Sequence, residues 1–330
     1  MKAKMKDIGK YHSHALNVGL GVQSTATALM CMNGDLPKPD CFIFADTQWE
    51  REGSYENYER LSPMADEAGI PFHVIKTKNI RQAQLTISRS GTELPYYIDP
   101  SRYETVDGLR QLLISDVTKY YHKQKKIEKL FEVTLDDLLH DALTEFDSKV
   151  EAGIITEGYK KMDRSQMGRQ CTYNYKILPI QKFLRKHYGA HFKRPMGTWL
   201  GISIDEWTRM ADSETKAFVN FYPLVDYKIS RDDCKEYMEK LGYPVPVRSS
   251  CVGCPFSSND VWREKSDAEI QDASEFEEEV NQAIQDSELK DRPYYANGVR
   301  LHRSMKPISE RPFDEDDGEE ESICGGGCFL

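Results

Sequence analysis

The sequence contains no stretch of about 18 consecutive apolar residues, the length that a membrane-spanning helix requires. The basic stretch at residues 1–14 also lacks the apolar core that follows the charges of a secretory signal. These two absences predict a cytoplasmic protein that does not enter a membrane. In that compartment the eight cysteines are expected to be thiols, metal ligands or redox groups instead of disulfides.

Positive charge is scarce overall but is concentrated in one segment. The net charge of the chain is −10, of which residues 264–330, with 19 acidic and 7 basic residues, contribute −12. Residues 160–194 instead hold ten Lys or Arg and a single acidic residue, Asp163. Such a basic segment either binds nucleotide phosphates or a nucleic acid, or forms a solvated helix face.

The amino-terminal part of the chain alternates between strand and helix patterns. We expect strands at 15–20, 41–47 and 72–77, separated by helices at 24–33 and 52–67. The run CFIFADT is short, continuous and apolar, which is typical of a buried parallel strand. This alternation predicts an α/β protein with a parallel twisted sheet flanked by helices and right-handed crossovers.

The middle of the chain is different in character. Residues 105–131 and 135–151 have helical patterns, and Thr134 stands where the second pattern needs an N-cap. We expect these helices to form a helical insertion at about 80–160, or a cap over the sheet. No internal repeat is present in the sequence.

A further strand is expected at 198–203 and a further helix at 231–242. Beyond about residue 265 the chain is acidic and helix-prone, and it then loses its apolar residues. The predicted organisation is an N-terminal extension at 1–14, a main domain at 15–265, and an acidic helical region with a flexible, peripheral, cysteine-containing tail at 266–330.

The stretch LNVGLGVQSTATAL, residues 16–29, has the layout of a phosphate-binding loop. Gly19, Gly21 and Ser24 are small residues between a strand pattern and a helix pattern, where backbone N–H groups converge. A tight turn that only packs a helix on a strand has the same pattern. No Lys follows the glycines, which excludes a Walker loop, and Ser24 replaces the third Gly of a dinucleotide fingerprint.

Asp46 and Thr47 follow the second predicted strand, at the edge where open α/β sheets bind ligands. Asp46 either contacts a ribose hydroxyl, Mg²⁺ or the base of a nucleotide, or it caps the next helix.

The cysteines occur beside cationic residues and in one Cys-x-x-Cys pair. Cys171 lies between Arg169 and Lys176, and cationic neighbours favour the thiolate form that binds metals. Cys251 and Cys254 form the pair, which Pro255 follows. The pair is half of a zinc site, part of an iron–sulfur site or a redox dithiol, unless it is two buried thiols without a role.

Five segments, taken in order, resemble the phosphoadenosine phosphosulfate (PAPS) reductase family of the PP-loop ATP pyrophosphatase superfamily. The resemblance covers about residues 15–265, and its segments are GLGVQST, FADTQWERE, RQCTYNYKILPI, GISIDEWTR, and FYPLVDYKISRDD with PVPVRSSCVGCPF. It implies an adenine nucleotide alpha-hydrolase-like, Rossmann-like fold. The chain departs from the family pattern at Gln23, where the loop has an Asp, and it ends in Cys324-Gly-Gly-Gly-Cys328 in place of a Glu-Cys-Gly-x-His motif.

The resemblance implies binding of ATP or another adenine nucleotide with Mg²⁺. The residues that would contact the phosphates are Gly19, Gly21, Gln23, Ser24 and Thr25. Those that would contact the nucleotide or Mg²⁺ are Asp46 and Thr47. Those that would neutralise phosphate or sulfate charge are Arg169, Lys176 and Arg209. The basic residues 160–194 would suit a nucleotide or nucleic-acid substrate.

The resemblance also places Cys171, Cys251 and Cys254 where the family can hold an iron–sulfur cluster. Three ligands would leave one iron of a [4Fe–4S] cluster open, as in related thiolation enzymes. The alternative is a structural zinc ion bound by the Cys-x-x-Cys pair together with Cys324 and Cys328.

We therefore expect a PAPS-reductase-like enzyme that transfers sulfur to a nucleotide, nucleic acid or small molecule in an ATP-dependent reaction, in which the cluster or one of the thiols of Cys324 and Cys328 delivers the sulfur. A sulfur donor or reductant protein would be its partner. One alternative is a sulfonucleotide reductase in which Cys324 or Cys328 is the catalytic thiol and Arg209 contacts the substrate. Another is a non-catalytic, nucleotide-binding subunit of a modification or defence complex.

Overall fold

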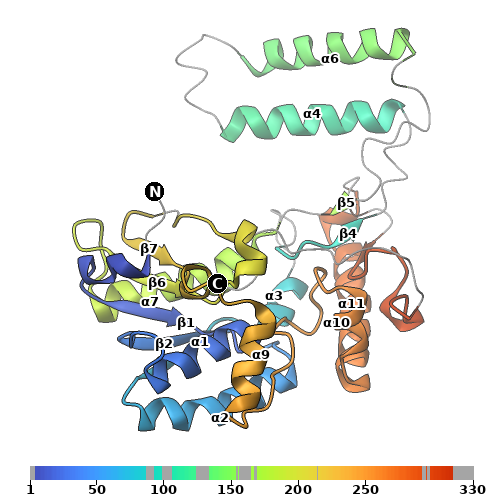
Figure 1. Ribbon diagram of the computed structural model, residues 1–330. Coiled ribbons are helices and arrows are strands. Elements are labelled where there is room, and N and C mark those ends of the chain that lie inside the picture. Colours follow the sequence, from blue (N-terminus) through green and yellow to red (C-terminus); the bar gives the residue numbers. More distant parts are fainter. Residues whose placement is uncertain are drawn as a thin grey trace.

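A five-stranded parallel sheet forms the centre of the protein (Figure 1). The computed structural model describes residues 4–86, 93–98, 106–123, 134–153, 155, 165–166, 169–213, 215–291, 295 and 298–314. The sheet has the order β3-β2-β1-β6-β7 and consists of β1 (His14–Asn17), β2 (Cys41–Asp46), β3 (Phe72–Lys76), β6 (Met196–Leu200) and β7 (Phe218–Phe221). The predicted α/β fold class is thus confirmed.

Helices cover both faces of this sheet, because the side chains of each strand alternate between two apolar cores. On one face Leu16, Phe42 and Trp199 are fully buried under α1 (Val22–Asn33), α2 (Glu52–Glu67) and α9 (Arg231–Lys240). On the other face Ala15 and Ile43 pack against α7 (Leu178–Tyr188). The core strands are therefore apolar on both sides, as a buried parallel sheet requires.

The order of the strands creates a switch point between β1 and β6. From β1 the chain proceeds through α1 to β2 on one side, whereas β6 pairs with the other side of β1. Ligands of open parallel sheets bind in the crevice that such a reversal leaves at the carboxyl ends of the strands. The loops that follow β1 and β6 meet at this point.

Strand β1 ends earlier than its apolar run predicts. The expected strand reaches residue 20, but β1 stops at Asn17, and Leu20 adopts a positive φ of 63° in the following loop. Strand β6 likewise ends at Leu200 instead of residue 203. In both places the loop after the strand is also buried. The run of apolar residues in the sequence is therefore longer than the strand itself.

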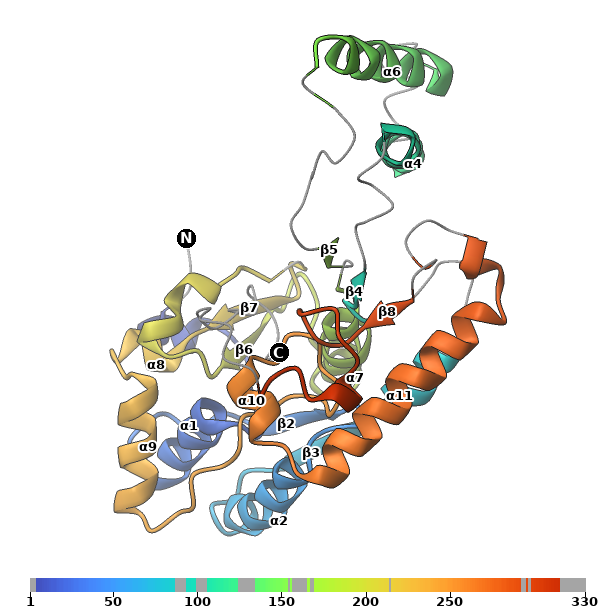
Figure 2. The same ribbon diagram turned by 90° about the vertical axis from the view of Figure 1, so that its right-hand side faces the viewer.

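The two helices of the middle region pack on each other as a pair. Helix α6 (Leu135–Glu151) begins at Thr134, which forms the predicted cap by accepting the backbone N–H of Asp137. Leu109 of α4 (Val106–Lys123) and Phe146 of α6 form the small apolar core between them. Figures 1 and 2 show the pair standing apart from the parallel sheet, so it does not cap the sheet.

A second apolar core lies beside the parallel sheet and is organised by α11 (Asp267–Gln285). Phe276 and Val280 of this helix are fully buried, together with Trp262 of α10 (Asn259–Arg263). An antiparallel sheet of order β5-β4-β8 borders this core and consists of β5 (Ser165–Gln166), β4 (Tyr97–Ile98) and β8 (Val299–Arg300). Helix α11 of the acidic region is thus packed in a core, because one of its faces is apolar and most of its acidic residues lie on the exposed face.

The other elements within the described residues are short. They are η1 (Met5–Lys10), α3 (Ile80–Leu85), the π-helical turn η3 (Tyr173–Ile177), η4 (Ile204–Arg209), α8 (Pro223–Asp226), η5 (Glu288–Asp291) and η7 (Ile308–Glu310). Among the described residues, a helix with the length and apolar character needed to cross a membrane is not found.

Candidate functional site

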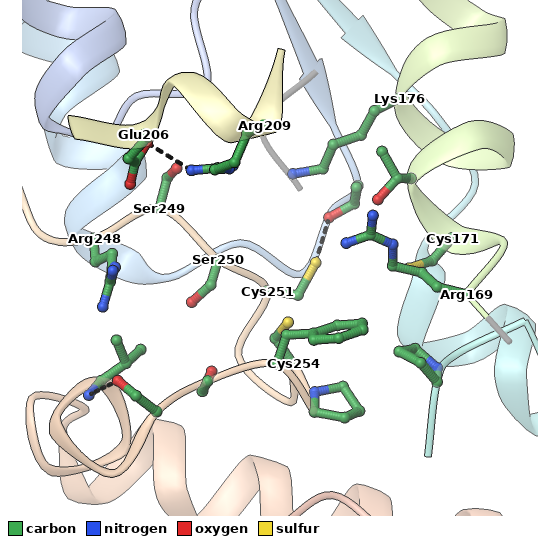
Figure 3. Close-up of a pocket in the computed structure, with 18 of the residues that line it drawn as sticks. Arg169, Cys171, Lys176, Glu206, Arg209, Arg248, Ser249, Ser250, Cys251 and Cys254 are labelled. Atoms are coloured by element: carbon green, nitrogen blue, oxygen red, sulfur yellow. Dashed lines mark hydrogen bonds and ion pairs between the residues drawn. The ribbon is translucent and has the colours of Figure 1, made fainter. Parts of the chain in front are cut away.

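A cavity of about 580 Å³ opens at the carboxyl edge of the parallel sheet (Figure 3). It lies between the sheet, the start of η3, and the segment from Arg248 to Val261 that leads into α10. Seven of the predicted site residues line it: Thr47, Arg169, Cys171, Lys176, Arg209, Cys251 and Cys254. Tertiary structure therefore brings together residues that are spread over more than half of the chain.

The glycine loop lies next to this cavity and lines a second, much smaller one, which shares Glu206, Arg231, Arg248 and Ser249 with it. Gly21 is the N-cap of α1, and the segment before the cysteine pair lies directly on it. A Cβ atom added to Gly21 would lie 3.0 Å from Ser249 Oγ and 3.3 Å from the Ser249 backbone nitrogen. A Cβ added to Gly201, after β6, would lie 2.8 Å from both Cα and N of Ser24. Glycine is needed at Gly201 because backbone occupies the space, whereas a side chain at Gly21 would require Ser249 to shift by a few tenths of an ångström.

Two arginines that the sequence reasoning missed line both cavities. Arg231 and Arg248 line the smaller cavity together with the predicted residues Gly21, Gln23 and Ser24. The N-terminus of α1 and two guanidinium groups thus face the same space, which favours an anion. The signal available in the sequence was weak, since Arg248 stands three residues before Cys251 in an otherwise neutral stretch.

Three other residues predicted to bind the nucleotide make contacts with other residues of the protein. These residues are Gly19, Thr25 and Asp46. Gly19 borders the same segment, since an added Cβ would lie 3.7 Å from Ser249 Oγ. Thr25 is fully buried, and its hydroxyl accepts a hydrogen bond from Asn57 Nδ2 at 2.8 Å. Asp46 accepts the backbone N–H of Gln48 at 2.8 Å and the hydroxyl of Tyr55 at 2.9 Å. The carboxylate of Asp46 therefore stabilises the turn before α2.

Lys176 is paired with a buried carboxylate. Its Nζ lies 3.0 Å from Oε1 of Glu50, whose side chain is 1% exposed. Thr47 donates to the same oxygen at 2.8 Å, and its hydroxyl lies 3.6 Å from Cys251 Sγ. Burial opposes the charge of Lys176, but Glu50 and the nearby cysteines raise the pKa of the ammonium group. Lys176 therefore carries positive charge beside the sulfur atoms and is paired with Glu50.

The remaining predicted cations converge on the cavity. Arg209 is 7% exposed, and its Nη1 lies 2.6 Å from Glu206 Oε2. Burial lowers the pKa of Arg209, and repulsion from Arg248 and Arg169 lowers it further in spite of Glu206. The guanidinium group of Arg169 lies 5.0 Å from the centre of the Phe256 ring. Positive charge is thus gathered along the length of the cavity, where it would stabilise a bound anion.

The three predicted ligand cysteines reach the cavity from two elements, as Figure 3 shows. Cys171 comes from the start of η3, whereas Cys251 and Cys254 belong to one tight turn in which Cys254 N donates to Cys251 O at 3.2 Å. Burial raises the pKa of all three thiols, that of Cys171 to about 11, and Cys254 adds to the effect on Cys171. Within the described residues, no group of three or more His, Cys, Asp or Glu side chains is arranged to hold a single metal ion.

Lys265 and Trp49, neither of which the sequence reasoning identified, support the turn that holds the cysteine pair. Lys265 is buried; its Nζ donates to the carbonyl of Val252 at 2.6 Å and lies 3.1 Å from the centre of the Trp262 ring. A Cβ at Gly253 would overlap the ring of Trp49, so only glycine fits there. The turn is therefore supported by side chains of the apolar core around α11. The predicted residues Cys324 and Cys328 lie outside the described residues.

Comparison with known proteins gives little beyond a resemblance in chain path. No protein-family model matches the sequence, and no curated protein matches it either. Among solved structures, the chain is similar to the phosphoadenylyl-sulfate (PAPS) reductase from Candida auris, in a phosphate complex, with 11% sequence identity and a TM-score of 0.34. That similarity covers 74% of this chain and 82% of the other chain.

Proposed function

We propose that this protein is an enzyme that binds an adenine nucleotide and uses it to transfer sulfur to an acceptor molecule. One observation carries the proposal. Ser249 packs against Gly21 of the glycine loop, and Cys251 of the cysteine pair follows Ser249 by only two residues in the same segment. The glycine loop and a set of thiols thus line two neighbouring cavities that share Glu206, Arg231, Arg248 and Ser249, which supports a reaction that joins phosphate chemistry to sulfur chemistry.

The nucleotide phosphates would occupy the N-terminus of α1. Backbone N–H groups of the loop, the Ser24 hydroxyl and the guanidinium groups of Arg231 and Arg248 are the groups that face this space. Gln23 leaves the loop without a carboxylate for Mg²⁺, but Glu206 lines the same small cavity and Asp205 lines the large one. A magnesium ion bound with the nucleotide would find its protein oxygen ligands there.

The proposed reaction has two steps and no net oxidation. First, a carbonyl oxygen of the acceptor attacks the α-phosphorus of ATP, the bond to the β-phosphate oxygen breaks, and pyrophosphate leaves. Second, a sulfide donor adds to the activated carbon, the carbon–oxygen bond breaks, and AMP leaves with that oxygen. Arg169 and Arg209 lie where they would stabilise the negative charge of the leaving groups. Sulfide, supplied by a partner protein or small molecule, is the required co-reactant.

The chemistry of three thiols suits an iron–sulfur cluster. The support for a cluster is that Cys171, Cys251 and Cys254 line one cavity. Cys171, Cys251 and Cys254 would hold a [4Fe–4S] cluster. When bound, such a cluster would supply an iron that the protein does not ligate and that could bind sulfide. The zinc alternative requires Cys324 and Cys328, which lie outside the described residues.

Metal and nucleotide measurements on the full chain test this function. Protein prepared without oxygen is expected to contain iron and sulfide and to absorb broadly in the visible range. Cys251→Ser should remove that absorbance, whereas Cys234→Ser, at a buried cysteine of α9, should retain it. A colourless protein that contains zinc would contradict the cluster and favour the structural alternative.

Pyrophosphate release from ATP, measured with sulfide and a panel of carbonyl-bearing nucleotides as acceptors, tests the enzyme itself. We expect release that depends on the acceptor and that falls in Ser24→Ala. ATP binding without any release would instead identify a non-catalytic nucleotide-binding subunit. Release of sulfite from PAPS, without ATP consumption, would identify a reductase and overturn the proposed thiolation.

A further inference from the structure

A second, smaller cavity of about 250 Å³ lies on the α7 side of the parallel sheet. It is bounded by the ends of β1, β6 and β7 on one side and by η3 and α7 on the other. Arg169 and Arg209 line both this cavity and the large one. The two cavities therefore share a cationic border, and a ligand in one would lie next to a ligand in the other.

Asn17, the last residue of β1, has an unused hydrogen-bond acceptor at this cavity. The side chain is 5% exposed, and its Nδ2 donates to the carbonyl of Trp199 at 3.3 Å. Its Oδ1 is buried and has no hydrogen-bond partner among the residues that the structure describes. Buried polar atoms are nearly always paired, and an exception in a cavity calls for a ligand that completes the pairing. That ligand must donate a hydrogen, as an N–H or O–H group does.

The rest of the lining favours a flat group with polar edges. Apolar side chains of Ile180, Leu200 and Phe218 form part of the walls. Thr198 and Asn220, which are hydrogen-bonded to each other at 2.8 Å, add polar groups at the sheet side. The cavity volume of about 250 Å³ is enough for one heterocyclic ring. Apolar faces with in-plane hydrogen bonds are what a nucleobase requires.

Positive charge continues from this cavity onto the protein surface. Arg185 of α7 is exposed, lies 5.2 Å from the centre of the Phe218 ring and donates to Gln181 Oε1 at 3.4 Å, and both of these partners line the cavity. Lys182 and Lys186 are exposed on the same helix. The acidic group in the lining is Asp212. A ligand that enters from this side therefore meets cations suited to a phosphate.

We propose that this cavity binds the acceptor of the reaction, and that the acceptor is the nucleobase of a nucleotide or of a nucleic-acid strand. A ring or exocyclic N–H of the base donates to Asn17 Oδ1, and the phosphate of the acceptor contacts Arg169 and the basic surface of α7. This assignment rests on the proposed function in naming an acceptor, but the binding itself requires neither ATP nor the thiols.

Binding of nucleoside monophosphates to the full chain, measured by calorimetry without ATP, tests the assignment. The probes are uridine, cytidine and guanosine 5′-monophosphate, with ribose 5-phosphate as the control that lacks a base. We expect at least one nucleotide to bind more tightly than ribose 5-phosphate and to lose about tenfold or more in affinity in Asn17→Ala. Equal affinity of ribose 5-phosphate and all three nucleotides would overturn the proposal.

Matched variants separate this site from the phosphate loop. Ser13→Ala removes a buried hydroxyl that also has no partner in the described structure and that lies outside the lining of this cavity. This variant should change neither the affinity for the nucleotide probe nor that for ATP. Ser24→Ala should weaken ATP and leave the probe unchanged, so a failed loop assignment and a failed acceptor site give different results. Thermal unfolding of Asn17→Ala and of the nearly isosteric Asn17→Asp checks folding. If both variants fold and bind the probe as the parent does, the proposal is wrong.

A short single-stranded oligonucleotide distinguishes the two sources of the base. If the base belongs to a strand, the oligonucleotide should bind more tightly than the monophosphate, lose affinity as salt rises, and weaken in Lys182→Ala with Lys186→Ala. If the base belongs to a free nucleotide, the monophosphate should bind at least as tightly and the double variant should change little. Either result, combined with the loss in Asn17→Ala, supports the cavity as a nucleobase site.

Discussion

The glycine loop beside the large cavity and the cysteine turn that lines it are constructed in opposite ways. At the loop, which we call the phosphate end because we propose that phosphates bind there, Gly201 lacks a side chain and the backbone of Ser24 occupies the space that a Cβ would need, while Ser249 packs closely on Gly21. At the sulfur end, side chains support the turn of the cysteine pair, namely Lys265 below Val252 and Trp49 beside Gly253. The phosphate end is thus formed by backbone that directly follows strands of the sheet. The sulfur end depends on a separate apolar core that is assembled around α11.

Removing the centre of that second core should have the largest effect. Phe276 is fully buried, and its ring centre lies 4.6 Å from that of Trp49 and 6.4 Å from that of Tyr96. Phe276→Ala is expected to cost about 3–5 kcal/mol in the free energy of unfolding. Urea denaturation measures this cost, and Glu278→Ala, at an exposed position of the same helix, is the control. Equal stability of the two variants would show that the sulfur end does not depend on this core.

A methyl group at Gly201 should damage the phosphate end alone. The new Cβ would meet the Cα and N atoms of Ser24 at 2.8 Å, so the loop after β6 or the start of α1 must move, at a cost of about 1–3 kcal/mol. We expect ATP affinity to fall about tenfold or more, measured by calorimetry, while the iron content stays at the parent level. Gly9→Ala is the control, since an added Cβ there meets no atom within 4 Å. Unchanged ATP affinity in Gly201→Ala would remove this loop from the nucleotide site.

Lys265→Met tests the sulfur end by a smaller change. The substitution keeps an unbranched apolar stem but leaves the Val252 carbonyl without its donor, which should cost about 1–3 kcal/mol in unfolding free energy. We expect the variant to lose iron faster to a chelator than the parent, with ATP affinity unchanged. Lys240→Met, at an exposed ion pair of α9, provides the comparison. Equal rates of iron loss in Lys265→Met and the parent would argue against a supporting role.

The smallest expected effect is a pH dependence at the start of β1. His14 Nδ1 accepts a hydrogen bond from Trp199 Nε1 at 3.0 Å, and Nε2 lies 2.9 Å from the carbonyl of Ile8, which fits the neutral ring. Burial lowers the pKa of His14, although hydrogen bonding to Ile8 and the charge of Asp40 oppose the shift. The unfolded chain therefore takes up the proton first, and stability should decrease as pH falls below about 6.5.

Urea denaturation at several pH values, compared between the parent and His14→Gln, measures this contribution. The parent should lose stability toward acidic pH more steeply than the variant. Identical slopes would exclude His14 as the cause. ATP affinity at pH values above that range should be unaffected in the parent, because the protonation site lies at the opposite end of β1 from the glycine loop.

The parallel sheet was predictable because its signals are local. Alternation of apolar runs and helix patterns locates β1, β2 and β3 to within a few residues, and the Thr134 cap marks the start of α6. The acidic region was harder to interpret. Its composition suggests a peripheral segment, yet Phe276 and Val280 recur on one face of α11 and anchor it in a core. Composition averages over both faces of a helix, whereas burial depends on one.

The sequence predicted many of the residues that line the site, but it did not predict which partners they contact. Cys171, Cys251 and Cys254 do share a cavity, but Arg248 and Arg231 carry no sequence signal that separates them from other surface arginines. Lys176 was expected to neutralise phosphate or sulfate charge, and nothing in the sequence indicated its pairing with Glu50, a residue that stands 126 positions earlier in the chain. Partners this distant are set by the packing of elements.

The amino-acid sequence by itself determined the strands, the loop of small residues and the positions of the cysteines, because short-range periodicity and steric limits act over a few residues. Only the tertiary structure decided which charges are paired, which acceptor of Asn17 is left over, and that the glycine loop and the cysteine segments line neighbouring cavities. Those outcomes depend on how the two cores pack, since a buried hydrogen bond or ion pair forms only where distant elements come into contact.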